Sequence, residues 1–90
     1  MRYHCGMNSA NRKTLEAVFA KPTRNDIRWA DIESLVRALG GEVIERGGSR
    51  VGLVVNGVRG NFHRPHPSPD TNKGAVDAVR MFLANAKVKP

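Results

Sequence analysis

The stretch 41–64, GEVIERGGSRVGLVVNGVRGNFHR, decides the fold of this chain. Apolar and polar side chains alternate along most of it, which is typical of strands with one buried face. Two turn-forming pairs, Gly48-Ser49 and Asn56-Gly57, interrupt the alternation. We therefore expect three antiparallel strands, at 42–46, 50–55 and 58–64.

The Asn56-Gly57 pair predicts how the second and third strands are aligned. Asn-Gly is preferred in a two-residue type I′ hairpin, because both central residues need a positive φ. One face then carries Val51, Leu53 and Val55 opposite Phe62, Gly60 and Val58, and the other carries Arg50, Gly52 and Val54 opposite His63, Asn61 and Arg59. We expect the first face to be core and the second to be polar.

The Gly48-Ser49 pair fits a type II′ turn between the first and second strands. This turn places Ile44 opposite Leu53 on the core face. Val43 and Val54 are then expected to pair on the outer face of the sheet, where a small apolar patch favours a protein partner.

Helical periodicity flanks the strands. Apolar residues at helical spacing predict a helix at 29–39, ended by Gly40, and a last helix at 73–86. Trp29 begins the first of these and is expected to pack in the core. A short extra helix is predicted at 12–20 and ends before Pro22. We expect residues 1–11 to form a flexible N-terminus and residues 12–90 to form a single domain. Two helices on one face of a three-stranded sheet make an α+β sandwich.

Composition narrows the class of function. The chain has 90 residues, with 15 Lys and Arg against 8 Asp and Glu and a formal net charge of +7, which favours a polyanionic or acidic partner. Its single cysteine, Cys5, cannot form an intramolecular disulfide, and no apolar run is long enough for a membrane span. We expect a cytoplasmic protein with no membrane association.

Four features together resemble the HicA family of toxin ribonucleases: the order of elements, the Gly48-Ser49 turn, the Arg64-Pro65-His66-Pro67 segment, and the helix opening Lys73-Gly74-Ala75-Val76. The resemblance covers about 27–88. It implies a fold similar to the double-stranded-RNA-binding domain (dsRBD), mRNA cleavage as an mRNA interferase, and a HicB-like antitoxin as partner in a type II toxin-antitoxin pair. The family usually places its catalytic histidine directly after the Gly-Ser turn, where this chain has Arg50.

The segment 46–69 contains no acidic residue, so it would attract phosphate. Arg50, Arg59, Asn61 and His63 converge on the outer face. An alternative is that these charges only keep the exposed sheet soluble and block edge pairing. Our candidate RNA-binding residues are Arg46, Ser49, Arg50, Arg59, Asn61 and Arg64.

His63 is the first candidate catalytic residue. Metal-independent RNA cleavage needs a base near neutrality for the 2′-hydroxyl proton, and imidazole is the side chain suited to this. The hairpin register places His63 across from Arg50. The alternative is an ordinary exposed strand histidine. His66, held between two prolines, is the second candidate, with loop packing as its alternative. We expect no metal site and no cofactor.

Two further hypotheses stay open at this point. The chain could be a catalytically inactive RNA-binding or antitoxin-binding module that keeps the fold. It could also be a small basic DNA-binding domain, which we disfavour because no helix carries a basic stripe suited to a major groove.

Overall fold

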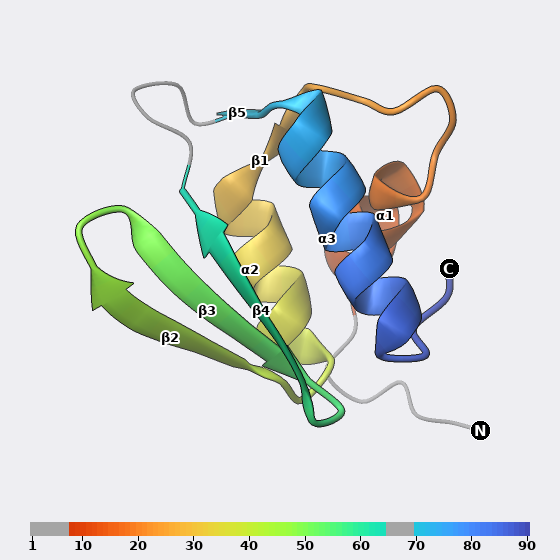
Figure 1. Cartoon of the computed structure of the whole chain (residues 1–90). Helices are drawn as coiled ribbons and strands as arrows, with labels where there is room; N and C mark the ends of the chain where they lie inside the picture. Colours follow the sequence, from red (N-terminus) through yellow and green to blue (C-terminus); the bar gives the residue numbers. More distant parts are fainter. Residues whose placement is uncertain (1–7, 65–69) are drawn as a thin grey trace.

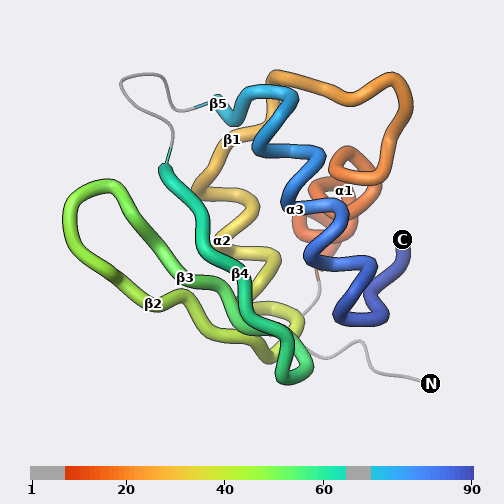
Figure 2. The backbone as a smooth tube through the Cα atoms, in the orientation of Figure 1, coloured from red at the N-terminus to blue at the C-terminus, as the bar shows by residue number. Residues whose placement is uncertain are grey.

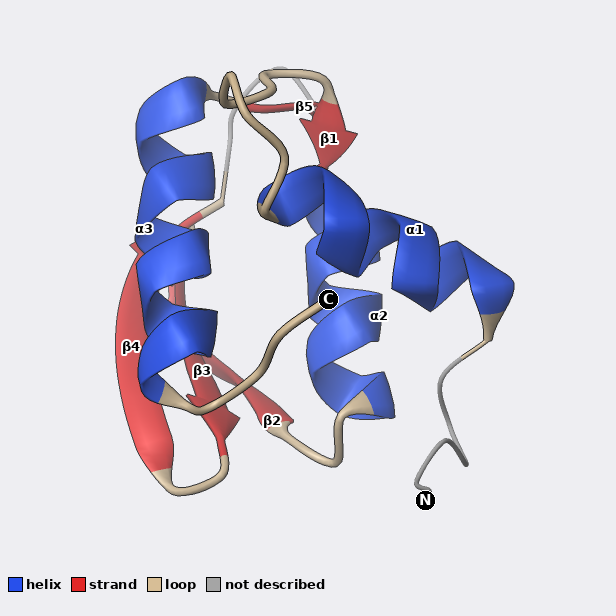
Figure 3. Cartoon of the chain, turned by 90° about the vertical axis from the view of Figure 1, so that its right-hand side faces the viewer, coloured by secondary structure: helices blue, strands red, loops and turns tan. Residues whose placement is uncertain are grey.

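The computed structural model describes residues 8–64 and 70–90. Two helices cover one face of a three-stranded antiparallel sheet, and a third helix packs on their far side (Figures 1 and 3). This α+β arrangement is consistent with the dsRBD-like fold class expected from the sequence. The elements in chain order are α1 (Ser9–Val18), β1 (Ile27–Arg28), α2 (Trp29–Ala38), β2 (Glu42–Gly47), β3 (Arg50–Val55), β4 (Val58–His63), β5 (Asp70–Thr71) and α3 (Lys73–Asn85).

The two main helices begin and end where local signals place them. At the end of α2, Gly40 has a φ of 83°, a conformation that glycine adopts without steric cost. The amide of Gly41 then donates to the Val36 carbonyl at 2.9 Å and closes the helix. At the start of α3, the Asn72 side chain accepts a hydrogen bond from the Ala75 amide at 2.8 Å. Both predicted main helices are confirmed.

The β3–β4 hairpin has the predicted register. Asn56 and Gly57 both have a positive φ, of 52° and 82°, as a type I′ turn requires. Val55 lies opposite Val58, and the ladder continues without interruption to Arg50 opposite His63. The face that packs against the helices therefore carries Val51, Leu53 and Val55 of β3, as expected.

The register of β2 differs from the prediction. Gly47 lies opposite Arg50, which fits a two-residue turn, but the pairing shifts between Glu45 and Gly47. A β-bulge at this point gives β2 one extra residue, Arg46, and moves all earlier residues by one position. Alternation along the sequence carries no signal for such a bulge.

The bulge exchanges the faces of two neighbouring residues. Val43, not Ile44, lies opposite Leu53 and packs against the core. Ile44 lies opposite Gly52 on the face away from the helices. The expectation that Ile44 faces the core and Val43 the outside was wrong, and Ile44 takes the place of Val43 beside Val54.

Three aromatic rings join the sheet to the helices. The ring centroids of Trp29 and Phe62 are 5.9 Å apart, and those of Phe62 and Phe82 are 5.7 Å apart in an edge-on arrangement. Trp29 is only 4% exposed, which confirms it as a core residue. Gly60 lies beneath these rings, because a Cβ there would come within 2.7 Å of Phe62 and 2.9 Å of Phe82.

Helix α1 is attached to the rest of the fold at both ends. It begins at Ser9, capped by Asn8, so Ser9 to Asn11 form its first turn instead of belonging to the N-terminal segment. The buried Asn11 donates to the Ser34 hydroxyl of α2 at 3.1 Å. At the other end, Arg80 of α3 donates to the carbonyl oxygens of Val18 and Ala20 at 3.0 and 3.2 Å.

A second, two-stranded sheet was not expected from the sequence. Ile27 pairs with Thr71, and Arg28 with Asp70, so that β5 runs antiparallel to β1 beside the start of α3. The β2–β3 turn projects to the left in Figure 2, beyond the helices. The two sheets are separate, and among the described residues the helices lie on one side of the larger sheet (Figure 3).

Candidate nucleic-acid interface

The face of the three-stranded sheet that points away from α2 and α3 is the candidate site, and we call it the outer face. Pairing across the strands arranges its residues in three rows. The row nearest the β2–β3 turn is the most basic. The outer face consists of Glu42, Ile44 and Arg46 from β2, Arg50, Gly52 and Val54 from β3, and Arg59, Asn61 and His63 from β4.

Arg50 and His63 lie directly opposite each other at the open end of the β3–β4 ladder, and both are exposed. Opposed residues of an antiparallel pair have Cβ atoms roughly 5 Å apart. The two side chains are therefore close enough to contact one phosphodiester together.

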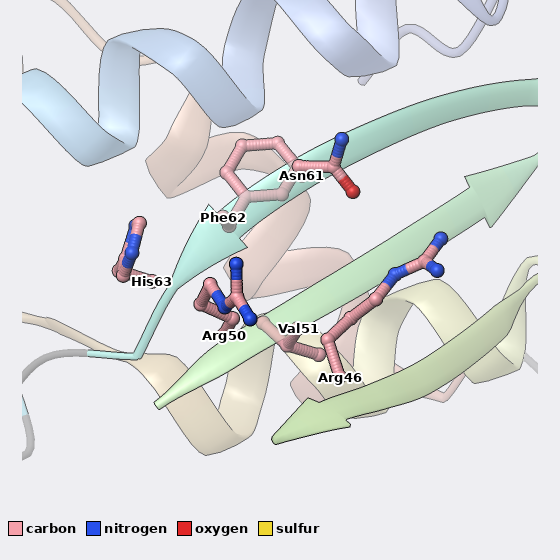
Figure 4. Close-up of a pocket in the computed structure, with 6 residues that line it drawn as sticks. All are labelled: Arg46, Arg50, Val51, Asn61, Phe62 and His63. Atoms are coloured by element: carbon pink, nitrogen blue, oxygen red, sulfur yellow. The ribbon is translucent and has the colours of Figure 1, made fainter. Parts of the chain in front are cut away.

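A hollow of about 500 Å³ occupies this end of the sheet. Figure 4 shows Arg50 and His63 at the same end of the hollow, whereas the guanidinium of Arg46 and the amide of Asn61 lie farther along the strands. The residues that line the hollow are Arg46, Arg50, Val51, Asn61, Phe62 and His63. No carboxylate is among them, so the hollow offers an anion two guanidinium groups and no opposing charge.

Arg64 follows His63 directly but has a different environment. Its guanidinium donates from Nε to Glu33 of α2 at 2.8 Å, and from Nη1 and Nη2 to the two carboxylate oxygens of Glu45 at 2.7 and 2.5 Å. The indole Nε1 of Trp29 donates to the same Glu33 oxygen at 2.7 Å. The backbone amide of Arg64 also donates to the carbonyl of Ser49 at 2.8 Å.

These contacts shift the pKa values of the groups involved. The hydrogen bonds that Arg64 donates to Glu45 and Glu33 raise the pKa of Arg64, and the hydrogen bond from Arg64 lowers the pKa of Glu45. Arg64 thus holds the end of β4 against the β2–β3 turn and against α2. Its donors are engaged within the protein.

The outer-face arginines have no such partners within 8–64 and 70–90. Arg46, Arg50 and Arg59 are exposed, and no acidic side chain of the described residues pairs with them. By contrast, Arg24 and Arg80 each contact an aspartate. A cation without an internal partner can bind an external anion without first losing an ion pair within the protein.

The structure brings half of the predicted site residues together in one hollow. Arg46, Arg50, Asn61 and His63 line one hollow, Arg59 lies farther along the outer face, and Ser49 is exposed in the adjoining turn. His66 lies outside the described residues.

Sequence reasoning missed two features. One is the Glu33–Arg64–Glu45 bridge, whose members are far apart in the chain. The other is the position of Arg46 over Gly52, where a Cβ on the glycine would lie 3.1 Å from the arginine Nε. The only sequence signal for the second feature is the glycine itself, because a side-chain-free position inside a strand often marks a close approach.

Neither a metal cluster nor a membrane helix is found in the part of the chain that the structure describes. No group of three or more His, Cys, Asp or Glu side chains there could hold a metal ion. No helix within those residues is long and apolar enough to cross a membrane.

Comparison with known proteins adds one finding. No curated protein and no solved structure matches the chain. The family model described as the HicA toxin of bacterial toxin-antitoxin systems matches residues 29–88, a range that contains α2, the whole three-stranded sheet and α3. Since this match spans more than half of the chain and includes every strand of the outer face, the chain belongs to the HicA toxin family of bacterial toxin-antitoxin systems.

Proposed function

We propose that this toxin is an mRNA-cleaving ribonuclease whose reaction is centred on Arg50 and His63. The observation that carries the proposal is the direct opposition of these two exposed side chains in a hollow with no acidic lining residue. An mRNA substrate places the activity in the cytoplasm.

His63 acts in this proposal as the general base. Its imidazole takes the proton of a ribose 2′-hydroxyl, and the 2′-oxygen forms a bond to the neighbouring phosphorus. The bond from phosphorus to the 5′-oxygen then breaks, which leaves a 2′,3′-cyclic phosphate and a 5′-hydroxyl. The departing oxygen needs a proton, and His66 is our candidate for this second acid or base.

Arg50 stabilises the negative charge that develops on the phosphorus. A guanidinium stays protonated at all physiological pH values, so Arg50 cannot replace the family's usual histidine as a base. It can donate two hydrogen bonds to the non-bridging oxygens as their charge grows. The imidazole that acts as the base and the guanidinium that stabilises the developing charge thus lie on neighbouring strands, β4 and β3.

The proposal does not require a metal ion. Divalent cations in phosphoryl chemistry prefer carboxylate oxygens, and the hollow is lined by cationic, amide and apolar groups. Arg46, Ser49, Arg59 and Asn61 are proposed to hold the rest of the RNA. Arg64, which was a candidate for RNA contact, has its guanidinium engaged by Glu33 and Glu45 and serves in our proposal to fix the position of the strand ends.

We propose that a HicB-like antitoxin covers the outer face. Ile44 and Val54 are half-buried there beside Arg50 and Arg59. An acidic partner with an apolar centre would contact both kinds of surface and exclude RNA. Adding the partner should therefore abolish RNA binding, and a complex that still binds RNA with full affinity would contradict this part of the proposal.

Cleavage of RNA by purified His63→Ala protein tests the catalytic assignment. Removal of a general base should lower the cleavage rate by about two to four orders of magnitude while RNA affinity stays nearly the same. Arg37→Ala, on the exposed side of α2, is a matched control that should leave the rate unchanged. Full activity of His63→Ala would reject His63 as the base.

One observation favours a second candidate function. Arg50 stands where the family usually has its catalytic histidine, so the chain could bind RNA or the antitoxin without cleaving RNA. A wild-type protein that binds single-stranded RNA but leaves it intact, with and without added Mg²⁺, would support this binding module.

A further inference from the structure

Gly52 forms a bare position in the centre of the outer face, and Arg46 occupies the space above it. A Cβ built on Gly52 would lie 3.1 Å from the Nε, 3.2 Å from the Nη2 and 3.6 Å from the Cζ of Arg46. Contacts of similar length to three atoms of one guanidinium mean that this planar group lies across the backbone of β3. Its other side remains open to solvent, because Arg46 is exposed.

Asn61 lies beside this guanidinium. It is the ladder partner of Gly52, it is exposed, and it lines the same hollow as Arg46. Figure 4 shows the Arg46 guanidinium and the Asn61 amide toward the same end of the hollow, away from His63. A planar cation and an amide with one donor and one acceptor group are therefore presented together.

We infer that Arg46, Gly52 and Asn61 form a subsite for one nucleobase, next to the phosphodiester that Arg50 and His63 contact. The inference rests on the proposed function, since it assigns a specificity role within the same site. Bases of single-stranded RNA stack on arginine guanidinium planes and are read through hydrogen bonds at their edges. The Arg46 guanidinium provides the plane on which the base stacks, and the Asn61 amide forms hydrogen bonds with the edge of the base. Gly52 has no side chain, so the guanidinium can lie over the backbone at this position.

The spacing fits a base and the phosphate next to it. The Gly52–Asn61 pair is two residues along the strands from the Arg50–His63 pair, which corresponds to roughly 7 Å at the rise of an antiparallel strand. A single strand that lies along β3 can thus present its backbone at one end of the hollow and a base at the other.

The chemistry of Asn61 favours adenine. An asparagine amide forms two hydrogen bonds with the N6/N7 edge of adenine, where an amino donor stands beside a ring-nitrogen acceptor; guanine presents two acceptors at this edge, and the pyrimidines have no N7. A correct bidentate pair discriminates by about 5- to 150-fold against a base without that pattern. Arg46, in contrast, stacks on any base and raises affinity without selection.

The test measures affinity for oligo(A), oligo(C) and oligo(U) with 2′-O-methyl riboses, which lack the nucleophilic hydroxyl and stay intact. Wild type should bind oligo(A) more tightly than oligo(U) by at least fivefold. Asn61→Ala should bring this ratio close to one. Arg59→Ala, the comparison variant outside the hollow, should weaken binding to all oligonucleotides equally and keep the ratio.

Two further variants separate stacking from charge. Arg46→Lys keeps the charge but loses the plane, so it should weaken binding to every base. Gly52→Val fills the space under the guanidinium and should have the same effect. Full affinity in Arg46→Lys would show that Arg46 is only a phosphate ligand and would overturn its stacking role.

The outcomes distinguish this inference from the proposed function. A wild-type ratio near one, or a ratio that survives in Asn61→Ala, overturns the base subsite even if the protein cleaves RNA. Failure of wild type to cleave unmodified RNA overturns the proposed chemistry, whereas base discrimination that depends on Asn61 would still support the subsite.

Discussion

The double variant Arg50→Ala, Arg59→Ala tests whether the outer face carries the RNA. The two arginines lie in different rows of the sheet, because Arg59 is opposite Val54 and Arg50 is opposite His63. Four residues along a strand correspond to roughly 13 Å, so each arginine is expected to contact a phosphate of its own. Neither has an acidic partner among the described residues, so each is free to neutralise one.

The expected magnitude follows from counterion release. On a single strand, each phosphate contact contributes about 0.7 to the slope of log affinity against log salt, so the loss of two contacts should flatten the slope by about 1.4. Between 50 and 200 mM KCl, the ratio of wild-type to variant affinity should therefore shrink by about sevenfold. Fluorescence anisotropy with a labelled, 2′-O-methylated oligonucleotide measures both slopes.

The matched control is Arg12→Ala, Lys13→Ala. It also removes two positive charges, but these side chains are exposed on α1, which packs on the far side of α2 and α3 from the sheet. Its slope should equal that of wild type. An unchanged slope in the outer-face variant, or an equal change in the α1 variant, would refute the assignment of RNA to this face.

Two further predictions concern stability. Gly60→Ala should lower the free energy of unfolding by about 1 to 3 kcal/mol, because the new Cβ lies within 3 Å of Phe62 and Phe82. Gly52→Ala displaces only the flexible Arg46 side chain and should therefore change the free energy of unfolding little. Thermal unfolding compares the two variants, and equal losses of stability would contradict the packing argument. Arg64 lowers the pKa of Glu45 below its ordinary value of 4.5, so the stabilisation from this pair is present above that pH and is lost as the pH falls through the lowered pKa. Glu45→Gln should therefore lose less stability than wild type on acidification. Parallel pH profiles of the melting temperature for the two proteins would argue against the pair.

Local signals explain which parts of the fold could be predicted. The register of β3 and β4 depends on Asn56 and Gly57, which fix a turn at one end of an uninterrupted ladder. The main helices follow from apolar spacing and from Gly40 at a helix end. These features depend on residues a few positions apart, so the sequence alone predicts them.

Features that depend on distant residues could not be predicted. The bulge at Arg46 leaves the alternating pattern intact but reverses the faces of Val43 and Ile44. Arg64 looks like any other cation of a basic segment until Glu33, 31 positions away, is brought to its guanidinium. The pairing of β1 with β5 joins residues that are far apart in the chain, Ile27 with Thr71 and Arg28 with Asp70, for only two positions.

Helix α1 lies outside the residues that match the family, but it packs as part of the folded domain. The family match begins at residue 29, yet Arg80 within it directs its donors to the carbonyls of Val18 and Ala20, and Leu15 and Val18 are core residues. A chain shortened to the matched residues would leave these donors without acceptors and would open an apolar surface between α2 and α3. In this toxin the N-terminal helix is therefore a structural part of the domain, and any shortened or fused version must start ahead of Asn8, the residue that caps it.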